Sequence, residues 1–354
     1  MAESDGALRV LVALAVGLMA LAFPFFASGY HIYQGSQVLI LAIALLGLNL
    51  LTGFNGQISL GHGAFFAIGG YGAAILITKF GLPFWAAIPL ASVVCFVAGF
   101  LFGFPALRFG GLYLALATFA LAVATPQILS YTGFDAFTGG SQGLSLPKPL
   151  APLGLRLNPD QWLYLVCLGC GAALYWAARN LARGRIGRAL IAIRDQPIAA
   201  ETMGVHAALY KTTCFGVSAL YAGVAGGLSA IAVGFVSPES FGLPLSLAFL
   251  VGIVVGGLGS LGGVLFGALF IEFVPNLADQ LSVSFGESAK ALPGAIYGAL
   301  LILVMAAMPT GVAGAARAAT KAVLRGLAPS RRTEVENDGG ANIAGKYEEK
   351  GESP

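Results

Sequence analysis

The chain has 354 residues, of which 57% are hydrophobic and 10% are charged, and its formal net charge at pH 7 is +3. Because about a quarter of the residues in soluble domains are charged, this composition excludes an ordinary soluble enzyme and gives no basis for nucleic-acid binding. The length supplies roughly ten helices of the ~20 residues that cross the hydrocarbon core of a membrane. We therefore expect an all-α, polytopic integral membrane protein.

Apolar runs of membrane length follow one another along most of the chain. The expected spans are 8–28, 36–52, 63–79, 84–104, 112–130, 162–178, 212–235 and 291–308. The first run is longer than a signal-peptide core and lacks a clearly basic leader, so we interpret it as a retained span. Two shorter runs, 245–256 and 264–275, predict a helical hairpin or a broken helix. Residues 1–310 are thus predicted to form one transmembrane domain with about ten transmembrane or re-entrant helices.

Lys and Arg are distributed unevenly between the two sides of these spans. Thirteen lie on one side and four on the other before the last tail lysines are counted. Cytoplasmic loops are enriched in Lys and Arg, so both termini are predicted to be cytoplasmic. Residues 131–161 are rich in Gly and Pro and predict a periplasmic loop. Residues 311–354 are basic and then polar, which predicts a disordered cytoplasmic tail.

Two glycine-rich turns share the tripeptide Ser-Leu-Gly, at 59–61 and 260–262. Both are flanked by apolar runs and are expected on the same side, which predicts a weak parallel internal repeat. Polar side chains at lipid depth are costly unless they line a cavity or pair inside the bundle. The first turn is therefore interpreted as part of a substrate pathway, with the candidates Gly56, Gln57, Ser59, Gly61 and His62. Close helix packing is the alternative reading of the glycines, and it is at least as strong for the second turn, where Ser260 is the polar candidate.

Glu272 is the carboxylate expected deepest in a span. An intramembrane charge is usually functional. Pro275 and Asn276 follow it, so a position at a helix end near the outer surface is the alternative, and both readings stay open.

The basic block between two spans predicts a short helical hairpin at 187–204. Arg188 and Arg194 fall off the apolar face of its first part. Asp195 is expected to cap a second short helix, and Gly204 to end it. An ordinary cytoplasmic loop that is rich in Lys and Arg would explain the arginines, but not the residues that begin and end two short helices. We therefore interpret the hairpin as a structure that docks into a partner protein. The candidate coupling residues are Gly187, Arg188, Arg194, Asp195, Glu201 and Gly204.

Catalytic constellations are not apparent in the sequence. The three histidines are far apart, and no hydrolase or metalloprotease motif occurs. Residues 340–346 have P-loop spacing, but Tyr347 replaces the Ser or Thr that holds magnesium. We expect no enzyme activity, no metal site and no cofactor bound by this chain, so that any ATP would be used by partner subunits.

A series of motifs in fixed order resembles the LivM-type permeases of branched-chain amino acid ABC transporters. The matching segments are 51–63, 111–118, 138–144, 187–195, 200–204, 256–262 and 309–311. The resemblance implies an importer of the bacterial inner membrane, which pairs with a second, homologous permease, two cytoplasmic ATPase subunits and a periplasmic substrate-binding protein. It adds Thr118 to the pathway, assigns 187–204 to the ATPase contact, and points to Thr138, Gly139 and Gly140 for binding-protein docking.

The resemblance implies that branched-chain amino acids are carried inward, but the substrate is not fixed by it. Relatives in the same family take up urea, amides or aromatic acids. An ion-coupled secondary transporter is a rival from another class and would need carboxylates in its spans, where Glu272 is the one candidate. A passive channel, the other rival, would not need the docking hairpin.

Overall fold

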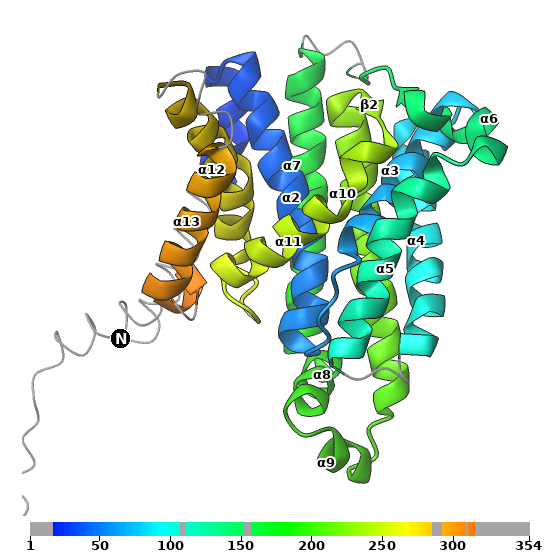
Figure 1. Ribbon diagram of the computed structural model, residues 1–354, viewed down its shortest axis with the longest axis vertical. Helices are drawn as coiled ribbons and strands as arrows, with labels where there is room; N and C mark the ends of the chain where they lie inside the picture. The colour runs from blue at the N-terminus through cyan, green and yellow to red at the C-terminus, as the bar shows by residue number, and fades with distance from the viewer. Residues whose placement is uncertain are drawn as a thin grey trace, which may run out of the picture. The chain divides into compact units, whose positions relative to one another are not determined.

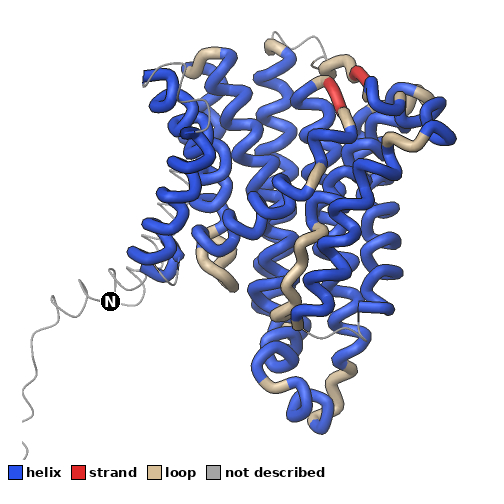
Figure 2. Tube along the Cα trace, viewed as in Figure 1, coloured by secondary structure: helices blue, strands red, loops and turns tan. Residues whose placement is uncertain are grey.

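The computed structural model describes residues 17–106, 111–149, 151, 157–284, 292–308 and 311–315. The described part of the chain is a bundle of helices with one two-stranded sheet, which confirms the all-α class (Figures 1 and 2). The long helices are α2 (Gly29–Asn49), α3 (His62–Thr78), α4 (Phe84–Ala106), α5 (Leu112–Leu129), α7 (Pro159–Arg183), α10 (Ala207–Val233), α11 (Leu243–Gly256), α12 (Val264–Ser284) and α13 (Leu292–Ala307). A shorter apolar helix, Gly17–Phe26, precedes α2.

Within the described residues, five helices are long and apolar enough to cross a membrane, or six if the bent pair of α5 and Thr132–Thr138 is one span. The chain is therefore a polytopic membrane protein. The helices coincide with the expected apolar runs except at their ends. α2 begins several residues before the expected span and continues as a π-helical turn, Leu50–Phe54.

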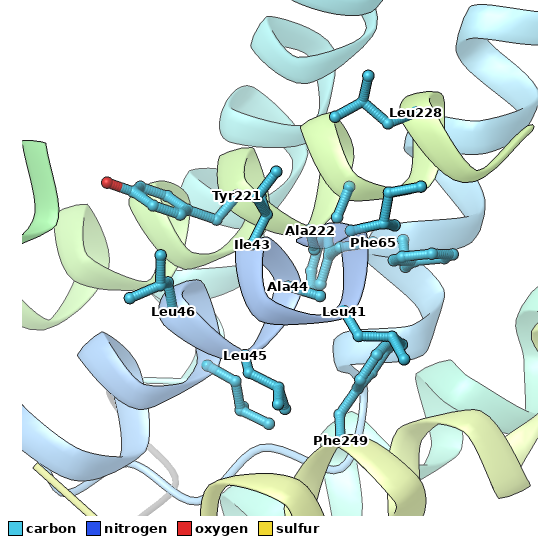
Figure 3. Close-up of a cluster of buried hydrophobic side chains, with 14 of the residues drawn as sticks. Leu41, Ile43, Ala44, Leu45, Leu46, Phe65, Tyr221, Ala222, Leu228 and Phe249 are labelled. Atoms are coloured by element: carbon cyan, nitrogen blue, oxygen red, sulfur yellow. The ribbon is translucent and has the colours of Figure 1, made fainter. Parts of the chain in front are cut away.

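The core of the bundle is formed around α2 and α10. Figure 3 shows Leu41 and Leu45 of α2 with Phe65 of α3, Leu228 of α10 and Phe249 of α11. α3 and α10 approach so closely that a Cβ on Gly226 would overlap the Phe66 carbonyl oxygen. Small residues at such crossings let helix backbones touch, which favours association inside a membrane.

α11 and α12 form an antiparallel hairpin, as expected. Its helices meet at two glycine pairs, Gly256 with Gly263 and Gly252 with Gly267, where a Cβ on the second member would overlap the carbonyl of the first. The expected length of the second helix is wrong, because α12 passes Pro275 and ends at Ser284. The Asn276 side-chain amide donates to the Glu272 carbonyl at 2.6 Å, which satisfies a backbone group beside the proline. Glu272 therefore lies within a helix and not at its end.

The two ends of the bundle carry different small elements (Figure 1). At one end, here called the sheet end, β1 (Leu144–Ser145) pairs antiparallel with β2 (Phe235–Val236). The same end holds the 3-10 turn Thr132–Phe134, α6 (Asp135–Thr138) and the 3-10 turn Gly140–Gln142, so the predicted loop 131–161 contains regular structure. At the opposite end, here called the hairpin end, α8 (Arg185–Asp195) and α9 (Pro197–Thr202) connect α7 to α10. Residues 316–354, the greater part of the predicted tail, lie outside the described residues.

Candidate functional site

The first glycine turn is an extended segment between the π-helical end of α2 and the start of α3. It is held at its beginning by its own polar groups. Thr52 Oγ1 donates to the Gln57 carbonyl at 3.0 Å, and the Gln57 amide nitrogen donates to the Leu51 carbonyl at 3.1 Å. The side-chain amide of Asn55 donates to Gln57 Oε1 at 2.7 Å. These bonds fix the exit of the chain from α2 and confirm that the helix breaks here.

The second half of the turn is fastened to α5. Thr118 Oγ1 accepts from the Leu60 amide at 2.9 Å and donates to the Ala115 carbonyl at 3.0 Å. A Cβ on Gly61 would lie 2.6 Å from the Thr118 carbonyl oxygen, so the two backbones touch. The Gly61 amide donates to Ser59 Oγ at 3.3 Å. The predicted pathway residues Ser59, Gly61 and Thr118 are thus brought together, and all three are buried.

His62 begins α3 in the interior of the bundle. Its Nε2 lies 2.8 Å from the Ala44 carbonyl of α2, an oxygen that can only accept, so Nε2 carries the proton. The imidazole meets the ring of Phe249 edge-on, with centroids 5.6 Å apart. The next residue, Gly63, donates its amide to Ser246 Oγ of α11 at 3.0 Å. A serine of another helix thereby supplies an acceptor for one of the free amides in the first turn of α3.

One edge of the first turn stays exposed. Gly56 and Ile58 are exposed, and they alternate with the buried Gln57 and Ser59. Gly56 has φ +73°, a conformation that favours glycine. The exposed edge is the part of this turn that is open to contact with another molecule.

The two glycine turns touch each other. Asn49, which is completely buried, donates its side-chain amide to the Ser260 carbonyl at 3.0 Å and accepts from the Gly259 amide at 2.9 Å. Gly53 faces the same place, because a Cβ there would overlap Asn49 Oδ1 and the Gly259 nitrogen. The two turns therefore meet at residues 49–53 and 259–260. The predicted pathway residue Ser260 takes part through its backbone and is partly exposed.

The hairpin at 187–204 has a small core of its own, formed by Ile193, Ala200 and Ala207. Gly187 is buried at the joint with α7, where a Cβ would overlap the Ala182 carbonyl. Gly204 has φ +82° and follows the end of α9, as predicted. Arg188 and Glu201 are exposed on the surface of the hairpin.

The predicted capping role of Asp195 is wrong. The residue that precedes α9 is Gln196, with φ −147° and ψ 84°, and no side chain caps the helix. Because Pro197 disfavours helical geometry in the residue before it, the break falls on Gln196. The Asp195 carboxylate instead accepts from Arg194 Nε at 2.8 Å.

Arg194 reaches from the hairpin to the end of α2, and its side chain stays 38% exposed. Its Nη1 donates to the Gly53 carbonyl at 2.7 Å, at the end of α2. Its aliphatic stem packs against Gly56, where a Cβ would lie 2.6 Å from Arg194 Cγ, and leaves that glycine partly open to solvent. Hence the coupling candidates Arg194 and Asp195 form a pair that holds the hairpin to the first glycine turn.

Sequence reasoning missed residues of two kinds. Asn49 and Ser246 form hydrogen bonds to backbone groups that are distant in the sequence. Each is a polar residue inside an apolar run, and this could have indicated a buried hydrogen bond at both positions. Ile198 and Met203 are large apolar side chains on the hairpin that are 80% and 87% exposed. Their exposure depends on how α9 packs, which the sequence pattern does not give.

The residues predicted to dock a binding protein lie in a compact turn at the sheet end. Thr138 and Gly140 are buried, and the Gly140 amide donates to Thr138 Oγ1 at 3.2 Å. Gly139 and Gly140 have φ of +72° and +56°. The exposed neighbours of this turn are Phe134, Asp135, Phe137 and Gln142. Among the described residues, no group of three His, Cys, Asp or Glu side chains could hold a metal ion.

Comparisons with known proteins match the chain to transport permeases. The family described as branched-chain amino acid transport system / permease component matches residues 33–305. The chain is 35% identical to the high-affinity branched-chain amino acid transport system permease protein LivM of Escherichia coli (strain K12), over 85% of this chain and 74% of LivM. LivM of Salmonella typhimurium (strain LT2) is 34% identical with the same coverage. The permease protein LivH of Escherichia coli (strain K12) is 24% identical over 77% of this chain and 91% of LivH. The chain therefore belongs to the family of permease components of branched-chain amino acid transport systems.

Proposed function

We propose that this chain is the membrane-spanning permease subunit of an ABC importer that carries branched-chain amino acids inward across a bacterial inner membrane. The observation that supports this most directly is the hydrogen-bonded connection between the α8–α9 hairpin and the two glycine turns, in a chain of the permease family. A permease driven by separate ATPases needs such a connection between the surface that binds the ATPases and the helices that open the pathway to one side of the membrane or the other.

The proposed complex contains a second, homologous permease, two cytoplasmic ATPase subunits and a periplasmic substrate-binding protein. LivM and LivH of Escherichia coli are both named as permeases of the high-affinity branched-chain system, which supports pairing of two related permeases. In this arrangement the hairpin end faces the cytoplasm, about ten helices are transmembrane or re-entrant, and both termini are cytoplasmic.

Each end of the bundle has a surface suited to its proposed partner. Ile198 and Met203 are large apolar side chains that the hairpin exposes almost fully, and the exposed, charged Glu201 lies between them in the sequence; we assign these residues to the contact with the ATPase. At the sheet end, we assign binding-protein docking to the exposed residues around the Thr138–Gly140 turn, which fixes their shape.

We place the substrate pathway along the exposed edge of the first glycine turn, at Gly56 and Ile58. Ser59, Gly61, His62 and Thr118 would then frame the pathway without touching the solute, because their polar groups are already bonded inside the bundle. Specificity would come mainly from the binding protein.

Uptake by the assembled complex tests this function. The complex is reconstituted with ATP inside proteoliposomes and the binding protein outside, and entry of labelled leucine is measured against unlabelled isoleucine, valine, urea, an amide and an aromatic acid. We expect ATP-dependent leucine entry that isoleucine and valine inhibit. Inhibition by only urea, the amide or the aromatic acid would reassign the substrate, and entry driven by an ion gradient without ATP would overturn the ABC mechanism.

A further inference from the structure

Arg194 makes two bonds in opposite directions from one side chain. Nη1 donates to the Gly53 carbonyl of the π-helical turn at 2.7 Å, and Nε donates to Asp195 of its own hairpin at 2.8 Å. The planar guanidinium can do this because its donors lie in a fixed fork. A lysine has one nitrogen at this distance and could hold one of these partners well, but not both.

The Gly53 carbonyl is a suitable acceptor for a cation. The last carbonyls of a helix have no partner in the helix itself, and they carry the negative end of its dipole. The π-helical turn that ends at Phe54 presents its carbonyls at the hairpin end of α2. Single π-helical turns inside or at the end of α-helices are frequent at functional sites.

The same turn is also bonded to the second glycine turn. Asn49, four residues before Gly53, holds Gly259 and Ser260 by two hydrogen bonds, and Gly53 itself packs against Gly259 with no room for a Cβ. The hairpin, the first glycine turn and the second glycine turn therefore meet at residues 49–53. A displacement of any one of them must break these bonds or carry the other two along.

We propose that Arg194 is a positioning residue that passes movement of the hairpin to both glycine turns through residues 49–53, and that it does not act by touching the ATPase. This inference rests on the proposed function and assigns the route by which the motor drives the permease. It also assigns Gly56 a place in the same route, since its missing side chain leaves room for the arginine stem.

Arg194→Lys keeps the positive charge but removes the guanidinium donors that bind Gly53 and Asp195 at the same time. It therefore separates the positioning role of Arg194 from a general electrostatic attraction to a partner. The matched control is Arg185→Lys, an exposed arginine at the start of the same helix that is not among the coupling candidates. In the reconstituted complex we expect Arg194→Lys to retain copurified ATPases at the parent level. Leucine taken up per ATP hydrolysed should fall by about tenfold, within the range of couplings seen along packed networks. Loss of the ATPases from the purified complex would show that Arg194 contacts them directly. An unchanged ratio of leucine taken up to ATP hydrolysed would overturn the proposed route from Arg194 to the glycine turns, which we call the relay.

A second measurement follows the relay without any substrate. Leu258, which is 53% exposed on the second turn, is replaced by a cysteine that carries a fluorophore, and its emission is recorded on addition of ATP. We expect a change in the parent and in Arg185→Lys that is lost in Arg194→Lys and in Asn49→Leu. A variant that combines Arg194→Lys with Asn49→Leu should lose no more of the fluorescence change than either single variant, because both substitutions break the same route. A signal that survives in Arg194→Lys would contradict the relay even if leucine proved not to be the substrate.

Discussion

Gly61 and Gly262 occupy the same place in the two Ser-Leu-Gly tripeptides, yet their surroundings differ. A Cβ on Gly61 would lie 2.6 Å from the Thr118 carbonyl, whereas a Cβ on Gly262 would meet no atom within 4 Å. The residues that follow differ in the same way, since Phe65 is 3% exposed and Phe266 is 48% exposed. The glycine of the first turn is thus explained by close packing with α5, and the glycine of the second is not.

Gly61→Ala is expected to destabilise the folded protein. Gly61 has φ −101°, which alanine adopts freely, so the cost comes from the missing space alone. Overpacking of this kind costs about 1–3 kcal/mol. The melting temperature of the purified protein in detergent measures this loss of stability. Gly262→Ala is the matched control, and its melting temperature should equal or slightly exceed that of the parent, because alanine restricts the unfolded chain. Equal melting temperatures for both variants would refute the packing role, and uptake per assembled complex would then decide whether Gly61 lines the pathway.

At the scale of an element, the hairpin shows where local sequence signals suffice. The spacing of 187–194 predicted a helix with an apolar face, on which the structure buries Leu190 and Ile193, and Gly204 marked the end of α9 correctly. Asp195 failed as a cap because the proline two residues later moved the break to Gln196. Pro275 misled in the opposite way, since α12 continues past it to Ser284.

The exposed apolar tip of the hairpin predicts a measurable contact. Replacement of both Ile198 and Met203 by serine should leave the membrane bundle folded, because neither side chain is in its core. The same change should weaken ATPase binding by roughly tenfold or more, because apolar side chains buried in a contact contribute about 1.5–3 kcal/mol each. Copurification of the ATPases with the permease measures the effect.

The control for the tip is replacement of the same two residues by leucine. Leucine keeps the apolar surface, so the ATPases should copurify as with the parent. If the serine variant retained its ATPases as well, the partner surface would have to be sought on the charged face of the hairpin, at Arg188 and Glu201.

At the scale of the whole molecule, the class, the positions of most helices and the location of the breaks follow from the sequence, because apolar length and glycine clusters are local signals. The contact between the two glycine turns does not follow. Asn49 and Ser260 lie 211 residues apart, and no local pattern pairs a buried asparagine with a particular distant backbone. The same holds for Arg194, whose sequence position suggested an outward-facing charge while its guanidinium bonds inward to Gly53.

The separation of the two ends of the bundle gives the last prediction. Gln142 is an exposed residue of the 3-10 turn next to α6 at the sheet end, and Arg185 is the exposed first residue of α8 at the hairpin end; Figure 1 shows α6 and α8 at opposite ends of the bundle. The thirteen-to-four distribution of Lys and Arg predicts that the hairpin end faces the cytoplasm. Single cysteines are introduced at these two positions in a chain whose partly exposed Cys170 is replaced by serine, since Cys95, Cys167 and Cys214 are buried. A membrane-impermeant maleimide added to spheroplasts should label Gln142→Cys at once and Arg185→Cys only after permeabilisation. Labelling of Arg185→Cys in intact spheroplasts would invert the topology, and the hairpin could then no longer be the surface that receives cytoplasmic ATPases.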